Sequence, residues 1–422
     1  MNVLIAGAGG FIGSRLAASL LDMGHIVSAG GRSRSASNPK LHWVEMDFAA
    51  PQVSAWTRAM SGIDVVINAV GILREGRGQT FRDLHFEGPR ALFSAAQAAG
   101  ARRVIQISAL GADESATARY HRSKHQADAF LQELALEWII AQPSLVYGPG
   151  GTSAALFETL ASLPVVLVPG NGSQPVQPVH IDDLTEALVR LVESAQVRRV
   201  VPLVGPEALT LHDFLLSLRE ALGLPRPRVV RIPRPVVAIA ARAGNLLPGA
   251  LLDTETLAML ERGNTAPAQP ITQLLGRAPR PVKRFIEPAE QQVFAGAAQL
   301  RWLEWLLRIG IAAMWLIAGI VSLGLYPIDA SLQLLVQIGT PPALAPVLLM
   351  GAALLDITLG LLTLWPRAPR GIWSAQIALV ALYTLIITLQ LPQLWLEPFG
   401  PVAKNLPVLA MLLLLRQLAV RR

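Results

Sequence analysis

Two residues that could transfer a proton lie one helical turn apart in the segment ARYHRSKHQAD, in which Tyr120 precedes Lys124 by four residues. Side chains at this spacing lie on one face of a helix, so a phenol and an ammonium could share a pocket. A phenol has a pKa of ~10 in water, and a nearby positive charge would lower that pKa toward neutrality. The pair therefore suits general acid catalysis, although two solvated side chains on a polar helix have the same spacing.

The same segment contains His121 and His125, whose spacing of four residues also occurs in metal sites. A protein metal site needs at least three ligands, and Asp128 is the one further candidate nearby. We therefore expect two ordinary surface histidines and no metal site.

The start of the chain has the order strand, glycine turn, helix, strand. Val3 to Ala6 form a short apolar run, as in a strand buried on both faces. Gly7 would allow a tight turn, Gly10 would let a pyrophosphate approach the backbone, and Gly13 would allow close packing of the helix. The amino terminus of that helix supplies N–H donors and the positive end of its dipole. The segment predicts a dinucleotide site with contacts at Gly7, Gly10, Phe11, Ile12 and Gly13.

The second strand ends without the acidic residue that would bind a ribose 2′-hydroxyl. Arg32, Ser33 and Arg34 follow it instead. Arginine pairs with a 2′-phosphate, which an acidic residue would repel. These residues predict NADP(H) as the preferred cofactor and NAD(H) as the alternative, while a solvated basic loop is the simpler interpretation.

Four further apolar runs continue the α/β alternation, with predicted strands within 41–48, 64–72, 102–112 and 136–151. In a doubly wound parallel sheet the carboxyl ends of the strands line the ligand crevice. Ser108 follows the fifth strand, immediately before the helix of Tyr120 and Lys124. Further predicted cofactor contacts at the strand ends are Asp47, Phe48, Ala69, Val70, Gly71 and Pro143.

The composition indicates a soluble part followed by a membrane part. The 422 residues are 52% hydrophobic and 15% charged, with a mean hydropathy of +0.44, and Asp and Glu nearly vanish after residue 304. A bilayer crossing needs about 20 apolar residues. Predicted spans lie at about 302–325, 343–365, 372–391 and 404–420. We expect a nucleotide-binding domain over 1–285, a linker over 286–300 and a four-helix membrane domain over 301–422.

The net charge of +7 and the pI near 10.3 raise the question of nucleic acid binding. The sequence has no Lys-rich arm, zinc pattern or aromatic-basic platform, and arginines beside membrane helices account for the excess charge. It also has no cysteine, which excludes a disulfide, a thiolate nucleophile and a Cys-ligated metal. Met1 runs directly into an apolar strand, so we expect no signal peptide.

The basic residues also predict an orientation in the membrane. The loops 326–342 and 392–403 contain no Lys or Arg. Arginines border the opposite ends of the spans: Arg301, Arg308, Arg367, Arg370, Arg416, Arg421 and Arg422. By the positive-inside rule, both termini and the soluble domain are cytoplasmic, in a bacterial-type inner membrane.

One carboxylate lies within the second predicted span, Asp356. A carboxylate at that depth usually faces a partner. Arg308 enters the first span from the same side, and at 1.5 Å per residue the two would differ in depth by about 5 Å. We predict an Arg308–Asp356 ion pair, which is either a structural clamp or a polar site for a quinone head group.

Six ordered motifs resemble a known family: GAGGFIG, VINAVG, ISALGA, YHRSK, QPSLVYGPGG and VQPVHIDDL. They resemble atypical extended short-chain dehydrogenases/reductases of the NAD-dependent epimerase/dehydratase superfamily, in particular the branch of the complex I dehydrogenase-like accessory subunit. The resemblance implies a Rossmann-like doubly wound parallel sheet with a small substrate lobe. It also implies a catalytic set of Ser108, Tyr120 and Lys124, in which Ser108 hydrogen-bonds the substrate oxygen and Lys124 holds the nicotinamide ribose.

One position departs from the family pattern. His85 occupies the place where typical members have an Asn that holds a proton-relay water, so cofactor binding is a safer inference than turnover. Residues 148–285 would form the substrate lobe, with His180 and Asp183 structural rather than catalytic. A basic, proline-rich strand and an apolar helix over 223–252 would pack over the substrate cleft or lie on an anionic bilayer surface.

Three apolar stretches, RIGIAAMWLIAGIVSLGLYP, GAALLDITLGLLTLWP and EPFGPVAKNLPVLAMLLLL, resemble the DoxX-like four-helix membrane family. Some relatives of that family are associated with quinol oxidation, which is an analogy for this chain. Residues 262–292, which precede these stretches, are expected to form an extended, proline-rich connection.

These features predict a membrane-anchored NADP(H)-binding oxidoreductase that acts on a quinone, a quinone precursor or another lipid-like carbonyl compound. The alternative is a non-catalytic, nucleotide-loaded structural or assembly protein of a membrane respiratory or quinone-biosynthesis complex. A nucleotide-sugar epimerase is a third interpretation. The lipid bilayer is a partner in each membrane-bound case, membrane-complex proteins are candidate partners, and nucleic acid is not.

Overall fold

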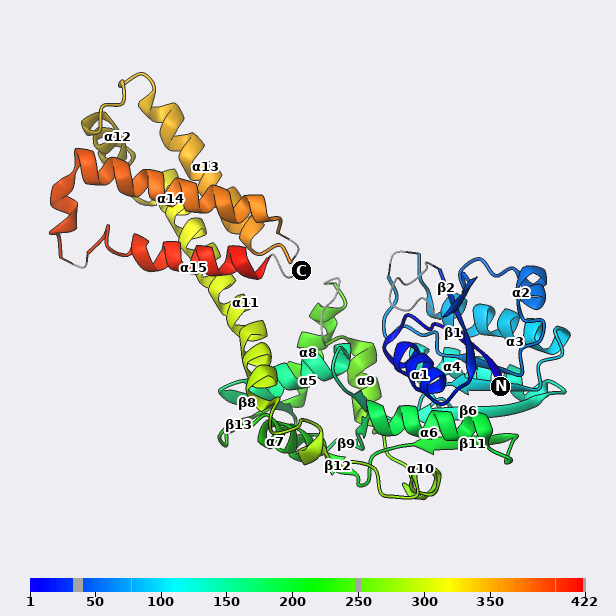
Figure 1. Cartoon of the computed structure of the whole chain (residues 1–422). Helices are drawn as coiled ribbons and strands as arrows, with labels where there is room; N and C mark the ends of the chain where they lie inside the picture. The colour runs from blue at the N-terminus through cyan, green and yellow to red at the C-terminus, as the bar shows by residue number, and fades with distance from the viewer. Residues whose placement is uncertain (33–40, 77, 247–251, 367, 399, 420–422) are drawn as a thin grey trace. The chain divides into compact units, whose positions relative to one another are not determined.

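The computed structural model describes residues 1–32, 41–76, 78–246, 252–366, 368–398 and 400–419. Contacts divide the chain into two compact units, Met1–Ala298 and Gln299–Arg422 (Figure 1). Five residues used in the predictions above lie outside the described residues: Ser33, Arg34, Arg367, Arg421 and Arg422.

A seven-stranded parallel sheet forms the centre of the first unit. Its strand order is β3-β2-β1-β4-β5-β6-β11, so successive crossovers run outward in opposite directions from the pair β1 and β4. The predicted Rossmann-like fold is confirmed, and β11 is a strand that the sequence patterns did not predict. The strands are β1 (Asn2–Ala6), β2 (Ile26–Gly31), β3 (His42–Glu45), β4 (Val65–Asn68), β5 (Arg103–Ile107), β6 (Glu137–Pro143) and β11 (Arg199–Leu203).

Helices cover both faces of this sheet (Figure 1). Along β1, Val3 and Ile5 belong to the core under one helical layer, whereas Leu4 and Ala6 belong to the core under the other. This alternation is the period of two of a strand, and burial on both faces explains the continuous apolar run. One layer contains α1 (Phe11–Asp22), α6 (Ile181–Glu193) and α10 (Gln269–Leu275). The other contains α2 (Val53–Ala59), the π-helical turn η1 (Asp83–Glu87), α3 (Gly88–Ala98) and α4 (Arg119–Glu133).

The remaining elements of the first unit form a lobe with its own core. Three two-stranded sheets pair β7 with β10, β9 with β12, and β8 with β13. The rings of Tyr147 and Phe285 stack in this core with their centres 4.8 Å apart. The strands are β7 (Val146–Tyr147), β8 (Val165–Pro169), β9 (Pro175–Val176), β10 (Val179–His180), β12 (Leu209–Thr210) and β13 (Arg228–Ile232). The helices are α5 (Thr152–Ser162), α7 (Leu211–Ala221), α8 (Arg234–Gly244), α9 (Thr254–Arg262) and the 3-10 turn η2 (Val282–Arg284).

The prediction of an extended connection over 262–292 is wrong, because this segment contains α10 and η2 and packs on the first unit. Ile271 and Phe285 are buried in its cores. Arg277 pairs with the fully buried Asp183 at 2.8 Å, and the backbone N–H of Arg280 donates to the same carboxylate at 2.6 Å. The prolines interrupt the helices of this segment, but the apolar residues between them still pack in the cores of the first unit.

The second unit is helical, and α11 begins ten residues before residue 301, within the segment expected to be a linker. The helices are α11 (Gln291–Ile320), the π-helical turn η3 (Val321–Leu325), α12 (Ile328–Gln337), α13 (Ala345–Thr363), α14 (Arg370–Gln390), the 3-10 turn η4 (Pro392–Trp395) and α15 (Asn405–Leu418). Within the described ranges, three helical segments are long and apolar enough to cross a membrane: Gln291–Leu325, Ala345–Thr363 and Arg370–Gln390. Helix α15 has 14 residues, fewer than the about 20 that a span needs, so the fourth span stays a prediction.

The predicted ion pair between Arg308 and Asp356 is wrong. Arg308 pairs instead with Glu304, one turn earlier on the same helix, at 3.0 Å, and donates to the carbonyl oxygen of Trp365 at 3.0 Å. A carboxylate one turn away on the same helix satisfies the guanidinium without matching the depths of two spans. Asp356 is itself buried, and its Oδ1 has no hydrogen-bond partner among the described residues.

The close approach of α1 to the glycine turn gives a first prediction. A Cβ on Gly13 would lie well inside van der Waals contact of the Gly7 carbonyl oxygen, whereas a Cβ on Gly9 would meet no atom within 4 Å. Gly13→Ala should therefore lower the unfolding free energy by about 1–3 kcal/mol, which outweighs the better helix propensity of Ala. Gly9→Ala is the matched control. Thermal melting of the cofactor-free protein in detergent measures both, and equal melting temperatures would contradict the prediction.

Candidate functional site

The sequence-predicted site residues gather at the carboxyl edge of the sheet. The turn after β1, the segment after β4 and the residue after β5 are adjacent because β1, β4 and β5 are neighbouring parallel strands. Gly7 has a φ of +82°, and a Cβ there would lie 2.9 Å from the backbone of Ala69 and Val70. Glycine at this position therefore allows the turn after β1 to touch the segment after β4, at the point where the strand order reverses.

The amino terminus of α1 fits the pyrophosphate of a dinucleotide. Its N-cap is Gly10, which provides no side-chain cap, and the space beside Gly9 is open to 4 Å. Uncapped N–H groups at a helix amino terminus, with no side chain to shield them, favour an anion. Phe11 and Ile12 begin the helix, and the guanidinium of Arg15 lies 5.0 Å from the centre of the Phe11 ring.

Arg32, Asp47 and Phe48, which we expected near the adenosine end of the cofactor, differ in their exposure and in their contacts. Arg32 is exposed directly after β2. When the Gln79 amide is oriented so that its oxygen faces the guanidinium, that oxygen accepts from the two terminal nitrogens of Arg32 at 2.5 and 2.7 Å. Asp47 is half-buried, and its Oδ1 accepts from the N–H of Ala49 at 3.0 Å. The ring of Phe48 is buried in the core, so only its backbone could contact a cofactor.

Lys124 is buried at the carboxyl ends of β4 and β5. Its Nζ donates to the carbonyl oxygens of Ile107 at 3.0 Å and Val70 at 3.5 Å. A Cβ on Gly71 would lie 3.2 Å from the same Nζ, so the glycine leaves room for the ammonium. Burial lowers the pKa of Lys124 to about 8, against the opposing effect of the Asp128 carboxylate. The lysine is therefore positioned from both strands and remains mostly charged near pH 7.

Tyr120 lines a cavity of about 470 Å³, together with Phe81, Asn245, Thr254 and other residues. Its ring contacts that of His85 edge-on, with the centres 5.3 Å apart. The expectation that a nearby positive charge lowers the pKa of Tyr120 is wrong in this structure, because burial raises that pKa to about 12. The phenol therefore keeps its proton near neutral pH and is available as a proton donor. Tyr120 thus lines the cavity, while Lys124, one helical turn later, is bound to the strand-end carbonyls.

Ser108 is close to the predicted set but directs its proton elsewhere. Its hydroxyl donates to Oδ2 of Asp128 in a short hydrogen bond. While Asp128 is ionised, the serine proton is engaged, and Ser108 cannot at the same time donate to a substrate oxygen. At the end of β6, Pro143 contributes a backbone carbonyl that accepts from the N–H of Leu110 at 3.0 Å.

Asp128 is a functional candidate that the sequence interpretation considered only as a metal ligand. It is 3% exposed, and its Oδ1 has no hydrogen-bond partner among the described residues. Burial raises its pKa to about 7, and the Ser108 hydrogen bond and the Lys124 charge oppose this rise. Its position four residues after Lys124 was the available signal, because that spacing continues the face of Tyr120 and Lys124.

His85 braces the site from the π-helical turn η1. Its Nε2 accepts from the N–H of Ile72 at 3.0 Å, so Nδ1 carries the proton and donates to Ser123 Oγ at 3.0 Å. Ser123 in turn donates to the carbonyl of Tyr120 at 2.9 Å. Burial first, and the charge of Lys124 second, lower the pKa of His85 to about 2, so this histidine is neutral. At the place expected for a relay Asn, the chain has a fixed imidazole.

The prediction of two surface histidines on α4 is wrong for His121. His121 is buried, and burial lowers its pKa to about 4, whereas His125 is half-buried. In the part of the chain that the structure describes, no group of three His, Cys, Asp or Glu residues could hold a metal ion.

Comparison with known families identifies both units. Residues 3–201 match the NAD dependent epimerase/dehydratase family, and residues 312–413 match the DoxX-like family. The chain joins an epimerase/dehydratase domain to a DoxX-like domain. The first is similar to NAD(P)-dependent, oxidoreductase-like enzymes, and the apolar helices of the second are those of a membrane domain.

Two of the curated relatives that match the epimerase/dehydratase domain illustrate the similarity. The chain is 29% identical over 265 residues to ceramide reductase of Caulobacter vibrioides, across 60% of this chain and 77% of that protein. It is 27% identical over 251 residues to the mitochondrial NADH dehydrogenase (ubiquinone) 1 alpha subcomplex subunit 9 of Arabidopsis thaliana, across 56% of this chain and 61% of that protein.

Solved structures show the same fold at low identity. A nucleoside-diphosphate-sugar epimerase from Staphylococcus aureus has a TM-score of 0.56 at 15% identity, over 68% of this chain and 99% of that one. The NADPH-dependent quinone oxidoreductase of Escherichia coli, complexed with NADPH, has a TM-score of 0.54 at 17% identity, over 67% and 97%. At these identities the likeness concerns the fold of the epimerase/dehydratase domain.

The raised pKa of Asp128 gives a pH-dependent prediction. Because the folded protein holds this proton more tightly than the unfolded chain, the contribution of Asp128 to stability falls as the pH rises from ~4, the ordinary carboxyl pKa, to about 7. Asp128→Asn cannot ionise, so the stability of the variant relative to the unaltered protein should rise with pH across this window. Paired melting curves from pH 4 to 8 measure the difference, with Asp113→Asn as an exposed control. A pH-independent difference for Asp128→Asn would contradict the assigned pKa.

Proposed function

We propose that this chain is a membrane-anchored reductase that uses NADP(H) to reduce a carbonyl group on a lipid-like substrate, with Tyr120 as the proton donor. The observation that carries the proposal is the position of Tyr120, which lines a cavity of about 470 Å³ one helical turn before the buried ammonium of Lys124. The proposed domain boundaries are those predicted from the sequence, with the linker shortened by the start of α11 at Gln291.

The chemistry assigned to the residues of this chain is a proton transfer. A bound nicotinamide would supply the hydride that reaches the carbonyl carbon. As that bond forms, the phenol of Tyr120 donates its proton to the carbonyl oxygen, which becomes a hydroxyl. The ammonium of Lys124, one helical turn further along α4, would stabilise the phenolate left on Tyr120 until water returns the proton. Ser108 would orient the oxygen only when Asp128 is protonated, since Asp128 otherwise holds the serine proton.

The substrate class rests on one relative, because the lining of the cavity is mixed. Leu73, Phe81 and Met259 are apolar, whereas most of the other lining residues are polar or charged: Arg74, Glu75, Arg119, Tyr120, Asn245, Asp253, Thr254, Glu255 and Thr256. Such a lining suits a molecule with both an apolar part and a polar head group. The similarity to a protein named ceramide reductase favours a lipid carbonyl over a quinone.

We also propose a cytoplasmic position for the first domain, in a bacterial-type inner membrane. Arg308 gives no information on the orientation in the membrane, because its side chain is buried and paired with Glu304. Arg370 begins α14, Arg416 lies in the last turn of α15, and Arg301 lies inside α11 before its apolar stretch. The described parts of the loops 326–342 and 392–403 contain no basic residue.

A second candidate function is a nucleotide-loaded structural or assembly protein. Two observations favour it: the proton of Ser108 is engaged by Asp128, and His85 is a fixed, neutral brace where a relay residue was expected. The similarity to a subunit of NADH dehydrogenase agrees with this reading.

Cofactor preference gives a prediction at Arg32. Because this exposed guanidinium follows β2 directly, NADPH should bind more tightly than NADH, and Arg32→Asp should weaken NADPH by about 10-fold or more while leaving NADH nearly unchanged. Paired titrations followed by nicotinamide fluorescence measure both affinities, and Arg58→Asp on α2 controls for net charge. Equal affinities of the unaltered protein for the two cofactors would contradict the preference.

Tyr120→Phe separates the two candidate functions. The variant removes only the hydroxyl, so NADPH affinity should stay within about twofold while turnover falls by about 10²–10⁴-fold. NADPH oxidation by the protein in lipid, assayed with a panel of long-chain ketones and quinones, measures turnover. Full activity in Tyr120→Phe would remove the tyrosine from the chemistry. An unaltered protein that binds NADPH and reduces no compound of either class would favour the structural role.

A further inference from the structure

Helix α8 of the lobe exposes an apolar face. Val237, Ala241 and Gly244 point inward and are buried. The opposite face consists of Val236, Ile239, Ala240, Ala243 and, just beyond the helix, Leu246, and all five are exposed. Ile239 is 64% exposed and Leu246 is 83% exposed. A helix on the surface of a water-soluble domain normally has polar residues at these positions, so this face is suited to an apolar environment.

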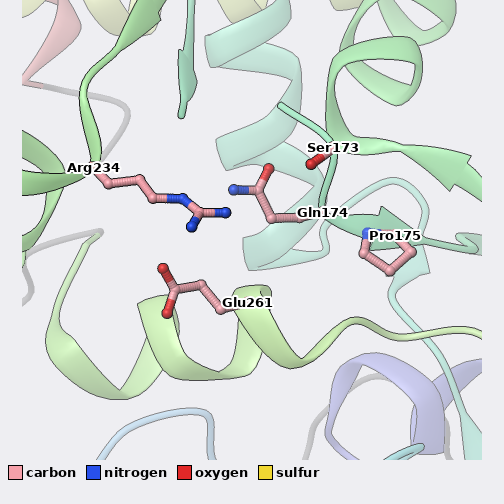
Figure 2. Close-up of a pocket in the computed structure, with 5 residues that line it drawn as sticks. All are labelled: Ser173, Gln174, Pro175, Arg234 and Glu261. Atoms are coloured by element: carbon pink, nitrogen blue, oxygen red, sulfur yellow. The ribbon is translucent and has the colours of Figure 1, made fainter. Parts of the chain in front are cut away.

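Arginines without carboxylate partners lie in the chain just before this helix and in its last turn. From Gly223 to Leu246 the sequence contains five arginines and no Asp or Glu. Arg226, Arg228, Arg231 and Arg242 are exposed, and none of them has an ion pair among the described residues. Other arginines of the unit do have carboxylate partners, as Arg119 and Arg262 have. The remaining one, Arg234, lines a pocket together with Gln174 and Glu261 (Figure 2), so we leave it out of the set.

We propose that the outward face of α8, with the arginines of β13 and of the helix end, docks on the anionic surface of the bilayer that anchors the chain. Exposed apolar side chains enter the interface between head groups and acyl chains, and the arginines bind lipid phosphates. The charge of the patch has one sign, which complements an anionic lipid surface. The chain's own membrane-spanning helices also keep the bilayer at a high effective concentration.

The docked helix would connect the bilayer to the cavity. Gly244 at the carboxyl end of α8, and Asn245 directly after it, line the same cavity as Tyr120. A lipid-like substrate could then pass from the bilayer along α8 to the phenol. This consequence rests on the proposed function, whereas the docking itself does not.

The absence of cysteine from the sequence permits a direct test. Ile239→Cys in the full chain is labelled with an environment-sensitive thiol fluorophore. Ile26→Cys is the matched control, because Ile26 is 67% exposed and begins β2 at the opposite edge of the sheet from the site. Each labelled protein is reconstituted in nanodiscs of phosphatidylcholine, with or without phosphatidylglycerol. We expect a blue-shifted emission and quenching by nitroxide lipids at position 239, stronger in the anionic discs, and neither effect at position 26.

Charge variants test the role of the arginines. Arg231→Gln with Arg242→Gln should abolish the extra shift caused by phosphatidylglycerol, whereas the control pair Arg58→Gln with Arg190→Gln, also exposed, should keep it. A label at 239 that behaves like the label at 26 in both lipids would overturn the proposal. A shift that depends on protein concentration in detergent would overturn it in favour of a second copy of the chain.

The outcome is independent of catalysis. If the label at 239 enters the interface and no carbonyl compound is reduced, the docking stands and the proposed function fails. If a lipid ketone is reduced and the label stays in water, the docking fails and the function stands. With both correct, the Arg231 and Arg242 variant should lower kcat/KM for a long-chain ketone and leave that for a short, water-soluble ketone unchanged.

Discussion

The buried ammonium of Lys124 is the constraint on which the site depends. A charge removed from water is costly unless its donors are satisfied, and here the carbonyls of Ile107 and Val70 accept from it at the ends of two adjacent strands. Only a parallel sheet with β4 and β5 as neighbours brings those two carbonyls together. The small Gly71 leaves space for the amine. The lysine therefore fixes α4 against the sheet edge, and with it the direction of Tyr120 one turn earlier.

A second buried group, Asp128, balances this charge and changes the role of its neighbour. The carboxylate lies one turn beyond Lys124 and accepts the hydrogen bond of the Ser108 hydroxyl, which would otherwise be free to donate to a substrate. His85 braces the opposite side by accepting from Ile72 and donating to Ser123. The buried side chains of Ser108, His85 and Ser123 are thus hydrogen-bonded to protein groups, and this pairing decides which protons are available at the cavity.

The membrane unit shows the same principle in a different solvent. Arg308 is almost fully buried, with Trp305 and Trp373 within 5.4 and 5.1 Å of its guanidinium carbon, and Glu304 supplies its carboxylate from the same helix. Trp315 donates to Gln376, which donates to Thr363, so a polar chain connects three helices. In an apolar environment these hydrogen bonds and ion pairs replace contacts with water. They form between residues that are neighbours in the fold, such as Arg308 and Glu304, rather than between Arg308 and Asp356, the pair that the sequence predicted.

The sequence by itself determined the elements with strong local signals. The glycine turn, the strand runs, the Tyr120–Lys124 spacing and the long apolar helices each depend on periodicity or on backbone freedom, which are properties of a short segment. Tertiary structure alone decided the strand β11, the packing of α10, the partner of Ser108, the neutral state of His85 and the replacement of Asp356 by Glu304 as the partner of Arg308. Each of these depends on which groups lose water together when distant segments pack. Burial and hydrogen-bond pairing between such segments leave no periodic trace in the sequence.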